Sequence, residues 1–188
     1  MRISLVALCC AVGFIALGGS RALADDKAPE PTLDKLQPEH KLLERLAGQW
    51  QFDKLSVAAE GAKPESLGTG TVSAELVGGF FVVSRWTGKV YGADYKAVQS
   101  LGYDIKAKQY TGCWIDSTMS YRWELSGTAQ EKTQELTIAA SGPSPTGCTC
   151  TFRERYQFPS ADSITVVGEM QQGEKWVPFL TTRLTRKR

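Results

Sequence analysis

From Gly48 to the C-terminus the sequence repeats one pattern, in which apolar and polar residues alternate over short runs. Breaks rich in Gly, Asp, Pro or Ser separate these runs. Successive side chains of a β-strand point to opposite faces, so the alternation is typical of strands with one buried face. Trp50 and Phe52 share a face in the first run, and Trp123 and Leu125 share one in a later run. About ten runs follow one another closely enough for hairpins rather than helical crossovers.

Consecutive antiparallel strands with one apolar face can close into an up-and-down barrel or fold over as a sandwich. Closure into a barrel removes exposed edge strands. A Greek-key sandwich normally needs a long connection, and the longest turn-like segment here is SGPSPTG, at residues 141–147. We therefore predict an all-β fold, an up-and-down antiparallel β-barrel of about ten strands.

One short amphipathic α-helix is predicted ahead of the first strand. The segment PEHKLLERLAG begins with Pro38, which suits a first helical turn, and Gly48 ends it. Leu42, Leu43 and Leu46 form a single apolar stripe. We expect this stripe to pack against the barrel.

Residues 1–24 are predicted to be a secretory signal peptide. An apolar stretch from Leu5 to Leu17 is followed by Ala22-Leu23-Ala24, the small-x-small pattern that precedes cleavage, and then by Asp25. The apolar stretch is shorter than the roughly 20 residues of a membrane-spanning helix. The mature protein is therefore expected in the periplasm or outside the cell, with no membrane span.

The mature chain is expected to form one domain. Residues 25–37 carry charge and proline and should be a flexible leader, and residues 38–188 should form the helix-plus-barrel domain. Loss of Arg2 and Arg21 reduces the 22 basic residues to 20, equal to the 20 acidic residues. This balance leaves no strong field to attract nucleic acid or an anionic membrane. The oligomeric state is left open.

Four stretches of the sequence resemble a bacterial family known only as a domain of unknown function. They are PEHKLLERLAGQW, LVGGFFVVSRWTG from Leu76, GYDIKAKQYTGCWID from Gly102, and the closing TTRLTRK. That family resembles the calycin group, which contains lipocalins, fatty-acid-binding proteins and nitrobindin-type barrels. The resemblance extends from about Pro38 to Lys187. It implies a calycin-type barrel with a ligand-binding interior.

The pair Gly48 and Trp50 is similar to the glycine and tryptophan at the start of the lipocalin barrel. In lipocalins a late basic residue stacks across that indole, and Arg183 or Arg186 would take this part here. We expect Trp50 to point inward at the closed end of the barrel and to form its floor, since a large aromatic side chain is usually core.

No cofactor and no metal are predicted. Nitrobindin-type relatives hold haem through an imidazole inside the barrel, whereas the single histidine of this chain, His40, lies on the predicted helix. There it is four residues before Glu44, close enough for a side-chain pair on the helix surface. A metal site would normally need three or four donors.

Three cysteines remain after removal of the signal peptide: Cys113, Cys148 and Cys150. They lack the C-x-x-C spacing of structural zinc sites, and an exported protein can keep disulfides. One disulfide is therefore favoured over a metal, with all three pairings open and at least one thiol unpaired within the monomer.

Two carboxylates lie on faces that the alternation turns inward. Glu154 shares a face with Phe152 and Tyr156, and a carboxylate among aromatic rings is costly unless it is paired. We expect either a hydrogen bond to Tyr103, Tyr121 or water, or a role as the polar anchor of a ligand. Asp116 lies near a strand end, where it either forms an Asx-type turn or faces the cavity.

The leading hypothesis is an exported lipocalin-like protein that binds a small, partly apolar molecule inside the barrel. The predicted ligand-binding residues are Trp86, Tyr103, Trp114, Asp116, Tyr121, Trp123 and Glu154. Two alternatives stay open. The first is an enzyme that uses Asp116 and Glu154 as acid and base, which is less favoured because the chain has no Gly-x-Ser-x-Gly elbow, HExxH motif or phosphate loop. The second is a cell-envelope interaction module with a filled barrel.

Overall fold

The computed structural model describes residues 33–58, 62–130, 132–133, 135–143, 147 and 149–188. The predicted signal peptide and most of the predicted leader, residues 25–32, lie outside these described residues. Lys35–Arg188 forms a compact unit. It begins with a 3-10 turn, η1 (Pro38–His40), that continues into the helix α1 (Lys41–Leu46). The predicted short N-terminal helix is thus confirmed.

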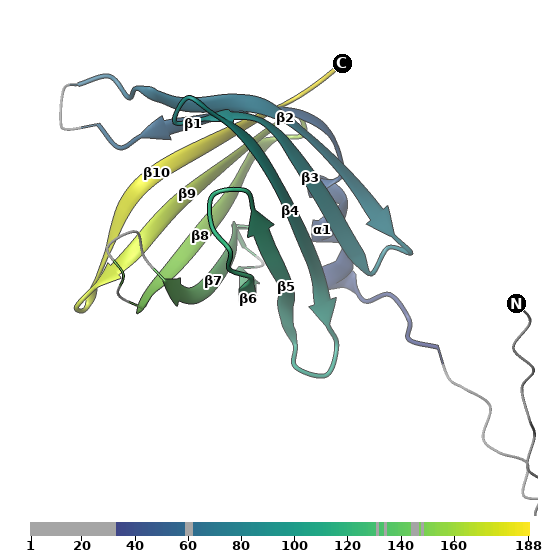
Figure 1. The fold of residues 1–188 in the computed structure, drawn as a ribbon. Coiled ribbons are helices and arrows are strands. Elements are labelled where there is room, and N and C mark those ends of the chain that lie inside the picture. The colour runs from purple at the N-terminus through teal and green to yellow at the C-terminus, as the bar shows by residue number, and fades with distance from the viewer. Residues whose placement is uncertain (1–32, 59–61, 131, 134, 144–146, 148) are drawn as a thin grey trace, which may run out of the picture. The chain divides into compact units, whose positions relative to one another are not determined.

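Ten strands follow α1 and form a closed barrel in which sequence neighbours pair antiparallel and β10 pairs back to β1 (Figure 1). They are β1 (Gly48–Ser56), β2 (Ser66–Val77), β3 (Phe81–Val90), β4 (Ala93–Asp104), β5 (Gln109–Asp116), β6 (Trp123–Gln130), β7 (Glu135–Pro143), β8 (Thr149–Ser160), β9 (Ser163–Gln172) and β10 (Lys175–Arg186). The prediction of an up-and-down barrel of about ten strands is confirmed. Closure leaves the barrel without an edge strand.

The helix covers one end of the barrel, which we call the closed end. Leu43 and Leu46, from the predicted apolar stripe, are buried in the barrel core. The Arg45 guanidinium lies 4.3 Å from the centroid of the Phe158 ring and donates a hydrogen bond to the Phe158 carbonyl. The helix is therefore fixed to β8 as well as to the strands beneath its apolar face.

Trp50 forms the floor at this end, as the sequence predicts. It is 1% exposed, and its indole Nε1 donates a hydrogen bond of 3.0 Å to the Leu46 carbonyl. The Arg186 guanidinium lies 4.0 Å from the centroid of the indole, and its Nη1 donates to the Ala47 carbonyl over 2.9 Å. Of the two basic residues proposed from the resemblance, Arg186 therefore stacks on Trp50, whereas Arg183 is exposed on β10.

Gly48 is needed beside this stack for two reasons. Its φ of +129° is a backbone conformation that residues with a side chain rarely adopt. A Cβ at this position would also lie 2.1 Å from Nη1 of Arg186. The glycine therefore lets the first strand start directly under the stacked guanidinium.

The outer face of β8 and β9 is tied together by an ion cluster. Nε of Arg153 and Nε of Arg155 donate to Oε2 of Glu169 over 2.5 Å and 3.1 Å. Burial alone raises the pKa of Glu169, but the hydrogen bonds and charges of the two arginines outweigh it, so the pKa lies below its ordinary value. Trp176 covers the cluster, with the Arg153 guanidinium 4.3 Å from its ring centroid.

Candidate functional site

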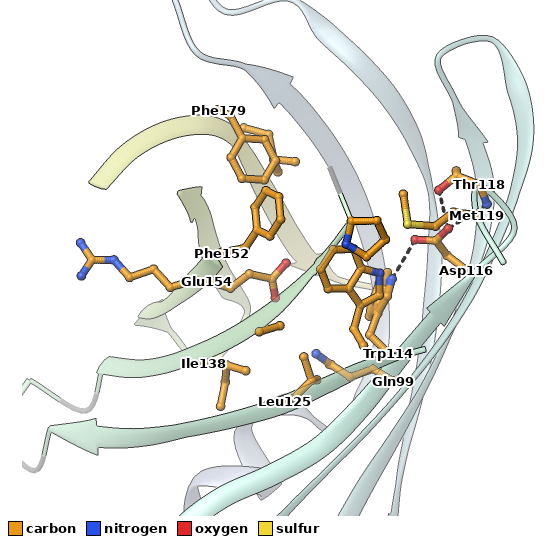
Figure 2. A pocket seen from close by; sticks show the side chains of 15 residues that line it. Gln99, Trp114, Asp116, Thr118, Met119, Leu125, Ile138, Phe152, Glu154 and Phe179 are labelled. Atoms are coloured by element: carbon orange, nitrogen blue, oxygen red, sulfur yellow. Dashed lines mark hydrogen bonds between the residues drawn. The ribbon is translucent and has the colours of Figure 1, made fainter. Parts of the chain in front are cut away.

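A cavity of about 270 Å³ lies inside the barrel at the end opposite α1, which we call the open end. The register of β1 and β10 runs from Trp50 opposite Arg186 at the closed end to Ser56 opposite Leu180, and Leu180 lines the cavity. Its remaining lining comes mainly from the ends of β5 and β7 and the starts of β6 and β8 (Figure 2). Cavities of a few hundred Å³ suit small molecules.

Aromatic rings form much of the wall. Trp114 on β5 and Trp123 on β6 are direct cross-strand partners, so both indoles face inward at the same height. The Trp123 and Phe152 rings meet edge to face with centroids 5.5 Å apart, and Phe152 meets Phe179 in the same way at 5.9 Å. Phe179 is 44% exposed, at the rim. The cavity therefore has an apolar wall that reaches the surface.

Glu154 is the acidic group within this wall. Figure 2 shows its carboxylate extending into the space between Phe152 and Ile138. Its Oε2 accepts a hydrogen bond of 2.7 Å from the Tyr156 hydroxyl, which in turn accepts one of 3.0 Å from Nε2 of Gln99. Burial, and then the charge of Glu154, raise the pKa of Tyr156 well above its ordinary value. The phenol of Tyr156 therefore stays protonated and donates a hydrogen bond to Glu154.

The sequence prediction named the wrong tyrosines as partners of Glu154. The partner is Tyr156, and neither Tyr103 nor Tyr121 bonds to the carboxylate. Residues two apart on a strand point to the same face and are neighbours on it, so the partner was present within the same strand.

Asp116 closes β5 at the cavity mouth. Its Oδ1 accepts a hydrogen bond of 2.8 Å from the Thr118 backbone N–H, which confirms the predicted Asx-type turn. Its Oδ2 accepts one of 2.8 Å from Nε1 of Trp114 (Figure 2). Asp116 also lines the cavity. Because both oxygens already accept hydrogen bonds, the residue fixes the Trp114 ring and adds negative charge.

A lysine inside the barrel escaped the sequence prediction. Nζ of Lys54, on β1, lies 5.2 Å from the centroid of the Tyr95 ring and 5.9 Å from those of Trp86 and Trp114. These distances are within the range of cation–π attraction. The signal was present in the sequence, because Lys54 continues the inward face of Trp50 and Phe52. A lysine at a strand end is usually solvated, so the alternation alone did not mark it.

The electrostatics at the open end couple this lysine to the two carboxylates. Burial lowers the pKa of Lys54, and the charges of Glu154 and Asp116 offset only part of that shift. Burial also raises the pKa of Tyr95, and the same two carboxylates raise it further. One lysine, two carboxylates and the phenol of Tyr95 therefore interact at the open end of the barrel.

Four of the seven predicted ligand-binding residues line the cavity: Trp114, Asp116, Trp123 and Glu154. Trp86 is buried beside Trp114 and Lys54 but is outside the lining. Tyr121 is 39% exposed and does not line the cavity; its ring meets that of Trp123 edge to face, with centroids 5.0 Å apart. Tyr103 lies at the closed end against His40, with ring centroids 5.6 Å apart.

His40 is buried at the closed end rather than placed on the helix surface beside Glu44, which corrects the prediction of that pair. Its Nδ1 accepts a hydrogen bond of 2.9 Å from the Gln37 backbone N–H, and its ring meets Phe80 edge to face at 5.3 Å. The imidazole is thus far along the barrel from the cavity. Within the described residues, no group of three or more His, Cys, Asp or Glu side chains is arranged to hold a metal ion.

Cys113 is a free thiol on the outward face of β5, 3.4 Å from the Ser100 hydroxyl. The two disulfide pairings that include Cys113 are therefore not formed. Cys148 lies outside the described residues, so the third pairing, with Cys150, stays a prediction.

Comparisons with known proteins agree with this architecture. The family described as "Protein of unknown function (DUF1579)" matches residues 35–186. The crystal structure of Rv2717c from M. tuberculosis is similar, with a TM-score of 0.54 and 15% identity over 82% of this chain and 100% of that chain. The S-type phycobiliprotein lyase CPES from Guillardia theta is similar with a TM-score of 0.50 and 16% identity, over 81% of this chain and 94% of that one. No curated protein matches. No helix of the described residues is long and apolar enough to cross a membrane.

Proposed function

We propose that this chain, which belongs to the DUF1579 family, is an exported binding protein that holds a small, partly apolar molecule at the open end of its barrel. The observation that carries the proposal is the cavity of about 270 Å³ walled by aromatic rings, with Glu154 and Gln99 as polar groups within it. Apolar walls with a few placed polar groups are the usual form of a small-molecule site.

The distribution of packing along the barrel supports this function over that of a filled barrel. The closed end is filled by Trp50, Leu43, Leu101, Leu136 and Ile164, each almost inaccessible to solvent. The open end, in contrast, contains a cavity that is lined by side chains from several strands. A barrel that served only as an interaction module would gain stability from filling this space as well, because cavities cost stability.

The likeness to the phycobiliprotein lyase supports only the fold at 16% identity. That protein is, by its name, a lyase for phycobiliproteins. For this chain the binding function rests on its own cavity. The enzyme alternative has weaker support, because both oxygens of Asp116 accept hydrogen bonds that orient Trp114 and the turn after β5.

Export is proposed from the sequence. The apolar stretch from Leu5 to Leu17 and the Ala22-Leu23-Ala24 pattern support cleavage before Asp25. Intact-mass measurement of the protein from culture medium and periplasm should give an N-terminus at Asp25. A soluble product that retains residues 1–24 would contradict this part of the proposal.

A matched pair of variants on β7 tests the binding function. Ala140 lines the cavity, whereas Ala139 is the next residue and points to the outer face. Ala140→Trp should fill the cavity and abolish binding, and Ala139→Trp should leave binding unchanged. Both variants are first compared with the wild type by thermal unfolding.

The binding measurement uses a library of neutral, cationic and anionic aromatic fragments, with tryptophan fluorescence and ligand-observed NMR as readouts. Trp114 and Trp123 line the cavity, so a bound fragment should change their emission. Saturable binding by at least one fragment is expected in the wild type and in Ala139→Trp. If no fragment binds saturably, or if folded Ala140→Trp binds as the wild type does, the proposed function is wrong.

A further inference from the structure

We propose that the molecule held in this cavity carries a cationic amine, for which Glu154 is the counter-ion. The inference rests on the proposed function and names the chemical class of its ligand. Three independent features of the open end lead to it: the direction of the hydrogen bonds, the count of charges and the chemistry of the walls.

The hydrogen bonds beside the cavity run in one direction. Nε2 of Gln99 donates to the Tyr156 hydroxyl, and that hydroxyl donates to Oε2 of Glu154. The chain of donors therefore ends on the carboxylate. Oε1 of Glu154 and Oε1 of Gln99 accept no hydrogen bond from the described residues, and both side chains line the cavity (Figure 2). The polar groups left for a ligand are acceptors, so the ligand has to supply the donors.

The charges of the interior do not balance. Among the described residues, the charged groups that interact inside the open end of the barrel are Lys54, Glu154 and Asp116. When all three are ionised, their net charge is −1. Arg153 also borders the cavity, but its guanidinium bonds to Glu169 on the outer face and stacks on Trp176. Glu154 and Asp116 are partly buried, and a carboxylate withdrawn from water without compensation is unfavourable. A ligand with one positive charge would bring the interior to neutrality.

Lys54 does not already provide this compensation at short range. None of the ion pairs of the described residues joins its ammonium to a carboxylate within 4.0 Å. Instead, the ammonium lies against the rings of Tyr95, Trp86 and Trp114. The cavity side of Glu154 therefore remains available to a second cation.

The walls suit an alkylammonium group. The rings of Trp114, Trp123 and Phe152 line the cavity together with Glu154. Aromatic rings attract ammonium groups that lie within about 6 Å of the ring centroid. The same barrel already holds a primary ammonium, that of Lys54, among three rings. An anionic ligand would instead meet the Glu154 carboxylate. The buried indole N–H of Trp86 has no hydrogen-bond partner among the described residues, but Trp86 does not line the cavity.

Three probes on one scaffold test the inference: 2-phenylethylamine, 2-phenylethanol and phenylacetate. They share the phenyl group and differ in carrying a positive charge, no charge or a negative charge at pH 7. Titration calorimetry and ligand-observed NMR at low ionic strength give the three dissociation constants. The amine should bind about tenfold to a hundredfold more tightly than the alcohol, since its hydrogen bond is to a charged group, and phenylacetate should bind most weakly.

Glu154→Gln should lower the affinity of 2-phenylethylamine to about that of 2-phenylethanol and leave the alcohol unchanged. The glutamine can still accept the hydrogen bond from Tyr156 but carries no charge. Glu124→Gln is the matched control, because Glu124 lies on β6 with its side chain 71% exposed. This control should leave all three affinities as they are in the wild type.

Lys54→Met provides a second test that does not depend on the folding of Glu154→Gln. It removes the interior cation, so the affinity for 2-phenylethylamine should rise while that for 2-phenylethanol changes little. An unchanged or lower amine affinity in this variant would overturn the inference.

The two proposals fail in different ways. If the alcohol or phenylacetate binds as tightly as the amine, or if Glu154→Gln keeps the full amine affinity, the cationic ligand is ruled out and the binding function stands. If neither the three probes nor the fragment library binds the wild type, the binding function itself fails.

Discussion

Replacing Arg186 with alanine removes the side chain that joins the last strand to the floor of the barrel. The guanidinium contacts the indole of Trp50, which is 1% exposed, at 4.0 Å. A cation–π contact with a desolvated ring contributes about 1 to 2 kcal/mol. The hydrogen bond to the Ala47 carbonyl comes from a charged donor. Because the Arg186 side chain is 30% exposed, its contribution is set at the low end for such bonds, about 1.5 kcal/mol. The ion pair with Asp162, 58% exposed, adds little.

These contributions belong to one side chain and do not simply add, so we expect Arg186→Ala to lower the free energy of unfolding by about 2 to 4 kcal/mol. For a domain of this size that loss corresponds to a fall in Tm of about 5 to 15 °C. Urea and thermal denaturation, followed by far-UV circular dichroism, measure both quantities. Arg186→Lys should lose an intermediate amount, since an ammonium cannot contact the indole and donate to the carbonyls of Ala47 and Ala161 as the planar guanidinium does.

Arg183→Ala is the matched control. Arg183 lies three residues earlier on β10, is exposed, and was the other basic residue proposed to stack on Trp50. Its replacement should change the free energy of unfolding by less than about 0.5 kcal/mol. Equal losses in Arg186→Ala and Arg183→Ala would refute the reasoning, because charge at the end of β10 rather than the stack on Trp50 would then account for the effect.

The outer ion cluster, a closed-end tyrosine, one packed glycine and one thiol each allow a further test. Glu169→Gln should lower the free energy of unfolding by about 1 to 3 kcal/mol in urea, because Arg153 loses its carboxylate partner and Arg155 keeps, among the described residues, only Glu135; an unchanged midpoint would contradict this. Burial raises the pKa of Tyr110 to about 12, so its stabilising contribution is complete below pH 10 and is lost as the pH rises through 12. Between pH 10 and 12 the free energy of unfolding should fall less steeply in Tyr110→Phe than in the wild type, and identical pH profiles would contradict this role of Tyr110. Gly127→Ala places a Cβ 1.9 Å from the Thr137 carbonyl oxygen and should cost about 1 to 3 kcal/mol in a thermal melt; a wild-type Tm would show that the strands can separate there at no cost. Cys113→Ser should remove one equivalent of maleimide labelling from the denatured, non-reduced protein, whereas an unchanged count would mean that Cys113 is bonded.

Much of the barrel could be predicted from the sequence because alternation is a local property. A strand presents successive side chains to opposite faces whatever its neighbours are. The inward direction of Trp50, Trp114, Trp123 and Glu154 therefore followed from the residues beside each of them, and the cavity and core contain all four. The number of strands and their antiparallel order followed in the same way from the short breaks between runs.

The position of a side chain along the barrel axis is not a local property. Tyr103 and Tyr95 lie on the same face of β4, yet Tyr103 contacts His40 at the closed end and Tyr95 contacts Lys54 at the open end. Register and strand tilt set these heights, and both depend on all ten pairings at once. The sequence prediction therefore placed Tyr103 in a cavity from which it is separated by most of the length of a strand.

The sequence was sufficient to predict a barrel with an aromatic interior, a helix at its start and a carboxylate among the inward residues. The tertiary structure was needed to show which end is filled, that Tyr156 is the partner of Glu154, and that Lys54 belongs to the site. Lys54 acquires its surroundings only when the barrel closes and brings Trp86 of β3 and Trp114 of β5, dozens of residues later in the chain, across the interior to β1. Electrostatic interactions depend on distance through space, and closure of the barrel creates distances that no pattern along the chain contains.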